Sequence, residues 1–157
     1  MKRQGFTLIE LLIVIAIIGI VAAIAIPNLL TALQKGKQKA TMGDMKSIGE
    51  AIESYLTDAY MVPAGATSVA GLATYLQPFY IKVLPRQDGW GHSMAYQSQG
   101  PGENQDIYSL ISYGRDGVAG PLALDWTLSP YVVTTMSGFA NDICYSNGSF
   151  TFAPKVK

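Results

Sequence analysis

Glu10 is the residue whose position most strongly indicates chemistry. It lies four residues into an apolar run, and from Phe6 to Leu33 it is the only charged side chain. A lone carboxylate is unfavourable in hydrocarbon, so an ionisable residue there indicates function and requires a partner. The alternative is a carboxylate that reaches up to the lipid headgroups. The two interpretations are compatible, because Glu10 could reach the headgroups in the monomer and pair in an assembly.

No other set of side chains has the pattern of a catalytic or metal site. His92 is the only histidine and is expected in a loop, whereas Cys144, the only cysteine, alternates with apolar neighbours and is expected to be buried. One cysteine excludes an intramolecular disulfide and a multi-cysteine metal site. Eleven basic and eleven acidic residues give zero formal charge, which argues against a nucleic-acid partner. We therefore expect a protein that is not an enzyme.

The segment that carries Glu10 is long and apolar enough to cross a membrane, because about 20 helical residues span a core of ~30 Å. Lys2 and Arg3 precede it and the next basic residue is Lys35, so the N-terminal tip is expected in the cytoplasm. Cleavage after AAIA at residues 22–25, as in an ordinary secretory signal, is an alternative that leaves Glu10 unexplained.

One long helix is predicted from Phe6 to Asp58, passing through Pro27 although proline removes one backbone donor. Beyond Asn28 it is amphipathic, and one face repeats at spacings of three and four: Met45, Ile48, Ile52, Tyr55 and Ala59. At 1.5 Å per residue the helix would be about 80 Å long. A domain made from the remaining residues cannot cover both halves. The first half must be buried by lipid or by other copies of itself, which predicts self-assembly.

Residues 59–157 are predicted to form a small globular domain. Residues 59–91 are typical of a connecting loop with one short helix near 68–76. Alternating segments predict strands at 93–97, 106–113 and 143–152, the last interrupted at Asn147-Gly148, a pair typical of hairpins. Residues 131–135 are a candidate fourth strand. The predicted fold is α+β, with a small antiparallel sheet on the amphipathic half of the helix and long irregular loops.

The N-terminal sequence KRQGFTLIELLIVIAIIGIVAAIAIPNLL resembles the class III signal of type IV pilins and type II secretion pseudopilins. In that family a prepilin peptidase cuts after the glycine, here Gly5, and methylates the new N-terminus, here Phe6. The resemblance implies the type IV pilin fold. It divides the chain into a leader (1–5), a transmembrane and assembly helix (6–27), an amphipathic helix (28–58) and a C-terminal domain (59–157).

The same resemblance implies roles in assembly for Glu10, Phe6 and Pro27. Glu10 would pair with the amine of Phe6 on a neighbouring subunit and so set the axial stagger of each incoming copy. The segment between Gly19 and Pro27 would be able to lose helicity during assembly.

The C-terminal part resembles more specifically the major pseudopilins of type II secretion systems. The segments that carry this resemblance are LPRQDGWGHSMAYQ, DIYSLISYGRDGVAG and FANDICYSNGSF. The chain departs from that group in two places. Gly89 stands where the group usually has proline, and residues 121–140 are longer than the usual link.

This second resemblance implies a structural calcium ion in the loop that begins at Gly114. Its ligands would be the side chain of Asp116, the main-chain carbonyls of Tyr113 and Val118, and Asp142, with Asn141 as a further candidate. Asp125 is a substitute if the insertion displaces Asp142. Calcium takes six to eight oxygens, so two carboxylates with carbonyls and waters would suit it. From the residues alone, Asp116-Gly117 is typical of a plain turn.

The leading hypothesis is a structural subunit of the bacterial inner membrane, with its N-terminus in the cytoplasm and its C-terminal domain in the periplasm. It would assemble into a helical periplasmic filament for type II protein secretion. The implied partners are other copies of the chain, the prepilin peptidase and N-methyltransferase, the inner-membrane assembly platform and the minor pseudopilins. The alternative is the major subunit of a surface type IV pilus. An electron-conducting filament is disfavoured, because no aromatic residue lies between Phe6 and Tyr55.

Overall fold

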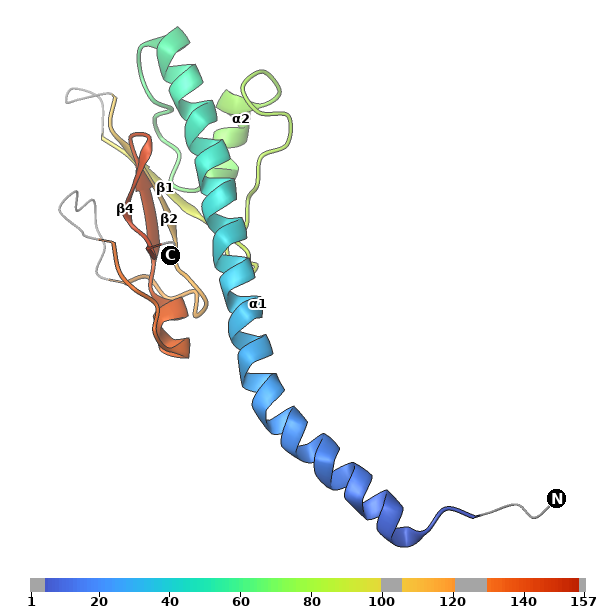
Figure 1. Ribbon diagram of the computed structural model, residues 1–157. Helices are drawn as coiled ribbons and strands as arrows, with labels where there is room; N and C mark the ends of the chain where they lie inside the picture. The colour runs from blue at the N-terminus through green and yellow to red at the C-terminus, as the bar shows by residue number, and fades with distance from the viewer. Residues whose placement is uncertain (1–4, 100–105, 121–129, 156–157) are drawn as a thin grey trace. The chain divides into compact units, whose positions relative to one another are not determined.

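The computed structural model describes residues 5–99, 106–120 and 130–155 (Figure 1). In chain order the elements are α1 (Leu8–Ala59), the 3-10 helix η1 (Val69–Leu72), α2 (Ala73–Leu76), β1 (Ala95–Ser98), β2 (Tyr108–Ser112), the 3-10 helix η2 (Met136–Ala140), β3 (Ile143–Ser146) and β4 (Ser149–Phe152). They form two compact units, which we call the first unit (Met1–Lys35) and the second unit (Gly36–Lys157). The predicted α+β class is confirmed.

In the first unit, the described residues 5–35 are mostly the N-terminal part of α1, and they bury none of their large apolar side chains. Its large apolar side chains from Leu8 to Leu33 are all exposed, by 45–76%. The segment is long enough and apolar enough to cross a membrane. The helix begins two residues later and ends one residue later than the sequence predicted, and it does not stop at Pro27.

Side chains add hydrogen bonds around Pro27. Proline has no N–H to donate to the carbonyl of Ala23. Asn28 donates from Nδ2 to the carbonyl oxygen of Ile24 at 3.2 Å, and Thr31 donates from Oγ1 to the carbonyl oxygen of Pro27 at 3.0 Å. Such side-chain bonds are one way in which apolar helices tolerate proline. The expected loss of helicity between Gly19 and Pro27 concerns an assembled filament and stays a prediction.

The second unit contains a four-stranded antiparallel sheet with the order β1-β2-β3-β4. β3 and β4 form the predicted hairpin, and Asn147 and Gly148 have φ angles of 44° and 81°. Both angles are positive, as a two-residue hairpin turn with the twist of its strands requires. β2 and β3 are buried along their whole lengths, whereas β4 lies at an edge and is only partly covered.

The prediction of a fourth strand at residues 131–135 was wrong. Only Tyr131 bridges to another segment, where its N–H donates to the carbonyl of Ala153 and its carbonyl accepts from the N–H of Lys155. The residue opposite Tyr131 is Pro154, which has no N–H to extend a ladder. The chain then turns into η2 after Thr135.

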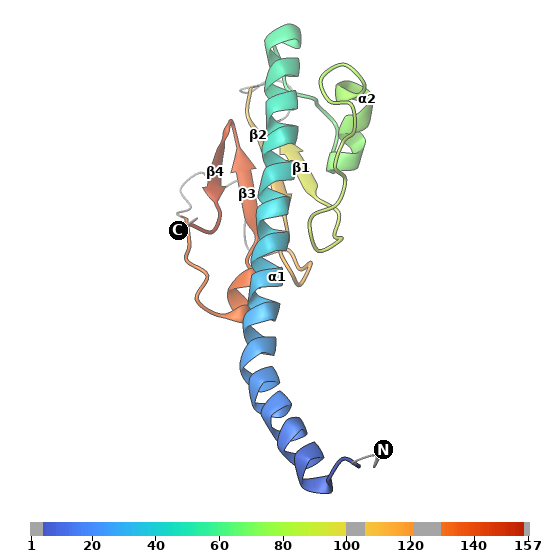
Figure 2. The same ribbon diagram turned by 45° about the vertical axis from the view of Figure 1, so that its right-hand side comes forward.

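The core of the second unit lies between α1 and the sheet, as the helical spacing predicted. Met45, Ile48 and Ile52 of α1 are fully buried. They share one cluster with residues of η1, α2 and the strands: Val69, Leu72, Leu76, Tyr96, Tyr108, Leu110 and Ile143. Figure 2 shows α2 beside the last turns of α1 and the sheet on another side of the same helix. The short helix expected near residues 68–76 is therefore confirmed, as η1 and α2.

Gly49 allows α1 to approach the sheet closely. A Cβ atom at this position would overlap Cε1 of the Tyr145 ring from β3. The hydroxyl of Tyr108 donates to Oε1 of Glu53 at 3.1 Å, one helical turn further along. Glycine is unfavourable inside a helix by about 1 kcal/mol relative to alanine. At position 49 the close contact between α1 and Tyr145 explains why glycine is present despite this cost.

We expect Gly49→Ala to lower the free energy of unfolding by about 1–3 kcal/mol, because the added methyl overpacks the Tyr145 contact. Gly43→Ala is the matched control, since a Cβ there meets nothing within 4 Å and alanine favours the helix. Urea unfolding of the detergent-solubilised full chain measures both. Equal stability of the two variants would contradict the packing described here.

Candidate functional site

The predicted processing site lies in the exposed chain before α1, outside regular secondary structure. Gly5 and Phe6 precede the first helical residue, Leu8, and Phe6 is 78% exposed. A peptide bond outside regular structure is open to a protease, unlike one inside a helix. The structure therefore places the Gly5–Phe6 bond where cleavage is sterically possible.

Glu10 closes a capping box at the start of α1. The N–H and Oγ1 of Thr7 donate to Oε2 of Glu10 at 2.8 and 2.7 Å, and the N–H of Glu10 donates to Oγ1 of Thr7 at 3.3 Å. This reciprocal pattern satisfies backbone donors that a helix N-terminus leaves free. Thr7 was missed in the sequence, although a threonine three residues before a glutamate and an apolar run is the known signal for it.

Both bonds from Thr7 go to the same carboxylate oxygen, Oε2. Among the described residues, none donates to Oε1 of Glu10. The cap therefore fixes the carboxylate on the first turn of α1 and leaves one oxygen able to accept a further donor.

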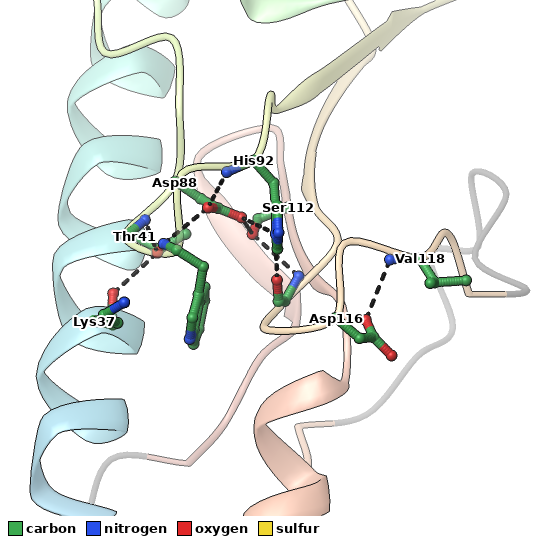
Figure 3. A network of polar contacts seen from close by, with 10 residues as sticks. Lys37, Thr41, Asp88, His92, Ser112, Asp116 and Val118 are labelled. Atoms are coloured by element: carbon green, nitrogen blue, oxygen red, sulfur yellow. Dashed lines mark hydrogen bonds and ion pairs between the residues drawn. The ribbon is translucent and has the colours of Figure 1, made fainter. Parts of the chain in front are cut away.

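In the second unit, Asp88 joins the loop before β1 to the end of β2. Its carboxylate is buried, and Oδ1 accepts the N–H groups of Trp90 and His92, both at 2.9 Å. Oδ2 accepts the hydroxyl of Ser112 at 2.8 Å. Figure 3 shows these side chains converging beside α1. Residues 88–92 are thereby held against the strand that leads into the predicted calcium loop.

Asp88, His92 and Ser112 are not arranged for nucleophilic catalysis. Ser112 donates directly to Asp88, whereas Nδ1 of His92 lies 2.9 Å from the carbonyl oxygen of Gly114. A catalytic serine instead bonds to the histidine, which the acid orients. Ser112 is also fully buried, so no substrate reaches its hydroxyl.

Gly89, which stands where the resemblance leads us to expect proline, packs directly on α1. Its N–H donates to Oγ1 of Thr41 at 2.9 Å, and Thr41 donates in turn to the carbonyl of Lys37 at 3.0 Å. A Cβ atom at Gly89 would overlap that same carbonyl oxygen. Proline would lose the donor and introduce the overlap.

The structure brings together the two segments that carry the predicted calcium ligands. The N–H of Arg115 donates to the carbonyl of Phe139 at 2.8 Å. The backbone of Gly114 lies so close to the carbonyls of Ala140 and Asn141 that a Cβ would approach them to 2.9 and 2.6 Å. The turn after β2 and the approach to β3 are therefore in direct contact.

Asp116 and Asp142 differ in their surroundings. Asp116 is exposed and accepts the N–H of Val118 at 3.2 Å. Asp142 is buried and accepts the N–H of Gly120 at 2.8 Å. Burial raises the pKa of the Asp142 carboxyl; the bond from Gly120 lowers it, and the negative charge of Asp116 raises it again. A bound cation would offset both the free-energy cost of burying this charge and the repulsion between the two carboxylates.

The remaining predicted ligands that the structure describes are exposed or half-buried. Asn141 is exposed, and its main-chain oxygen accepts the hydroxyl of Tyr131 at 3.5 Å. Tyr113 is half-buried and Val118 is exposed, whereas Asp125 lies outside the described residues. Across residues 5–99, 106–120 and 130–155, no three His, Cys, Asp or Glu side chains group as a metal site. Two carboxylates completed by carbonyls and water fit calcium, which prefers oxygen and tolerates irregular geometry.

Thr41→Val should lower the free energy of unfolding by about 1–2 kcal/mol, because the N–H of Gly89 loses its acceptor. Thr57→Val is the control. Thr57 makes the same bond within the helix, to the carbonyl of Glu53 at 2.9 Å, but is exposed, so its loss should stay within about 0.5 kcal/mol. Unfolding of the full chain in detergent compares them, and equal effects would exclude the proposed anchoring of Gly89.

Comparison with known proteins gives two family matches. The prokaryotic N-terminal methylation motif matches residues 1–26, and the family of type II secretion system protein G matches residues 28–127. The type II secretion system core protein G of Klebsiella michiganensis is 35% identical over 144 residues, which cover 82% of this chain and 99% of that protein. The Vibrio cholerae serotype O1 protein of the same name is 32% identical over 76% of this chain and 87% of its own length.

The Escherichia coli K12 core protein G is 33% identical over 129 residues, covering 76% of this chain and 86% of that protein. These matches favour the secretion hypothesis over the surface pilus. The methylation motif covers the first part of the exposed apolar segment of α1, which is long and apolar enough to cross a membrane. The chain belongs to the type II secretion system protein G family, the major pseudopilins.

Proposed function

We propose that the protein is the repeating subunit of a helical periplasmic filament, the pseudopilus, that serves type II protein secretion. One observation carries this proposal: the apolar side chains from Leu8 to Leu33 are exposed on every side of α1. Burying a Leu, Ile or Val side chain is favourable by about 1.5–3 kcal/mol, so the set represents on the order of tens of kcal/mol. A membrane can bury this surface in the monomer, and equivalent helices can bury it in a filament.

Processing and topology follow from the same segment. Lys2 and Arg3 favour a cytoplasmic N-terminus, so the second unit would lie in the periplasm. A prepilin peptidase and N-methyltransferase would cut after Gly5 and methylate Phe6, in keeping with the methylation motif over residues 1–26. The inner-membrane assembly platform and the minor pseudopilins are the other proposed partners.

Glu10 would guide assembly through the carboxylate oxygen that the cap leaves available. Cleavage after Gly5 creates a positively charged amine on Phe6. In a low-dielectric surrounding an unpaired charge is strongly unfavourable, and a pair is much less so. An incoming subunit whose Phe6 amine reaches Oε1 of Glu10 on its neighbour therefore has one preferred axial position.

Glu10→Gln should reduce filament yield at least about tenfold, because it removes the charge from a pair that is buried in the filament. Thr7→Ala is the matched variant, since it breaks hydrogen bonds of the cap but keeps the carboxylate, and it should reduce the yield less. Sheared or pelleted filaments are quantified by electron microscopy at equal subunit levels. Mass spectrometry must show that each mature chain begins at Phe6.

Wild-type filament yield in Glu10→Gln would refute the proposed pairing. Equal losses in Glu10→Gln and Thr7→Ala would show that the carboxylate acts only as a helix cap.

We also propose a structural calcium ion held by Asp116 and Asp142, with the carbonyls of Tyr113 and Val118 and the Asn141 side chain as further ligands. The ion would be a positively charged partner for the buried Asp142 carboxylate. The chain's own part is to hold the turn after β2 against the start of β3, through Arg115 and Phe139. The ion would fasten the long connection between these strands to the sheet.

Asp142→Asn should raise the stability of the calcium-free chain, because it removes a buried charge whose pKa is raised, and it should abolish calcium binding. Asp116→Asn should abolish binding with little change in calcium-free stability, because Asp116 is exposed. In the wild type, calcium at 100 times its Kd should stabilise the fold by about 2.7 kcal/mol. Calorimetry and thermal unfolding of the full chain in detergent test this, with the exposed Asp106→Asn as the control that keeps binding.

Absence of a calcium-binding signal in the wild type would remove this second proposal and leave the filament proposal standing. Wild-type affinity in both Asp116→Asn and Asp142→Asn would show that calcium binds elsewhere.

A further inference from the structure

We propose that His92 is a positioning residue for the calcium site: it does not bind the ion but holds the turn that presents Asp116. This inference rests on the calcium binding proposed above. His92 lies outside the set of proposed calcium ligands, so its role is distinct from theirs.

The first contact of His92 is with the turn's backbone at Gly114. Nδ1 lies 2.9 Å from the carbonyl oxygen of Gly114. A carbonyl oxygen only accepts, so Nδ1 carries the hydrogen and donates it. Gly114 directly follows Tyr113 and lies two residues before Asp116. The imidazole is therefore bonded to the main chain between two proposed ligands.

The second contact is with the other end of the same turn. A Cβ atom at Gly117 would lie 3.0 Å from both Cε1 and Nε2 of the imidazole, so the ring is packed against that backbone. His92 thus contacts the residues on both sides of Arg115-Asp116. Gly117 has no room for a side chain on the face that the ring occupies.

The turn needs such external support because of its own residues. Gly114 and Gly117 both have positive φ angles, 63° and 66°, which glycine adopts without strain. Glycine also loses the most conformational freedom on ordering, so the free turn samples many states. A contact that restricts these states before binding improves affinity by lowering the ordering cost.

His92 is itself firmly held. Its N–H donates to Oδ1 of Asp88 at 2.9 Å, and Oδ2 of Asp88 lies 3.9 Å from Nδ1 of the ring. Ser112 donates to Oδ2 of Asp88 and accepts the N–H of Gly114 at 3.4 Å. Asp88 therefore holds both the backbone of His92 and the end of β2, and Gly89 anchors the same loop to Thr41 (Figure 3). The support thus reaches the turn from a loop that is hydrogen-bonded to both α1 and β2.

His92→Ala should weaken calcium affinity about tenfold, the lower end of the effect of residues that orient metal ligands. His92→Asn should recover much of this loss, because its amide nitrogen can donate to the same carbonyl of Gly114. Gln87→Ala is the control in the same loop; its side chain is exposed, and it should leave affinity unchanged. The measurement is calorimetry of calcium binding to the full chain in detergent.

A second measurement reports on the turn without calcium. Trypsin cuts after Arg115, inside the turn, and after Lys82, an exposed residue far from it in the sequence. In calcium-free protein, His92→Ala should speed cleavage after Arg115 several-fold relative to cleavage after Lys82. A general loss of folding would speed both cuts together, and that result would overturn the positioning role.

The remaining outcomes separate the two proposals. If the wild type binds no calcium, both the site and the role of His92 are overturned. If Asp116→Asn abolishes binding while His92→Ala keeps wild-type affinity, only the role of His92 is overturned. Equal weakening in His92→Ala and His92→Asn would also overturn it, because the bond to Gly114 would then not be the cause.

Discussion

The exposed apolar surface of the first part of α1 is the constraint on which the protein depends. Between Leu8 and Leu33 the helix presents large aliphatic side chains on all sides, whereas between residues 36 and 59 it buries one face against its own domain. The first surface is stable only in lipid or against other apolar helices. A monomer in a membrane and a subunit in a filament are two solutions to the same physical problem, and one sequence provides for both.

Within that surface the polar groups are few and each has a local task. Thr7 and Glu10 satisfy backbone donors at the start of the helix, and Asn28 and Thr31 add hydrogen bonds around Pro27. The cap also keeps the Glu10 carboxylate at a fixed place on the helix. The second unit solves a different problem, because its long connections carry little regular structure. There Asp88, Gly89 and Tyr131 hold irregular segments to α1, β2 and the C-terminal chain.

Periodic and local patterns made much of the fold predictable. The helical repeat of Met45, Ile48 and Ile52 and the Asn147-Gly148 turn identified α1 and the β3–β4 hairpin, since each signal lies within a few residues. The capping box was equally readable. The hydrogen bonds around Asp88 could not be predicted, because they join the segments of Thr41, Asp88 and Ser112, whose separation in sequence follows no pattern. The strand predicted at residues 131–135 was wrong for a similar reason, since the residue opposite Tyr131 is a proline near the C-terminus.

Whether sister helices bury the apolar segment can be measured by its accessibility in filaments freed of lipid. In a Cys144→Ser background, Ile17→Cys and the exposed control Lys82→Cys are reacted with a water-soluble maleimide. Ile17→Cys should stay unlabelled both in membranes and in lipid-free filaments, while Lys82→Cys should be labelled and both should react after unfolding. Labelling of Ile17→Cys in lipid-free filaments at the rate of Lys82→Cys would show that sister helices do not bury the segment.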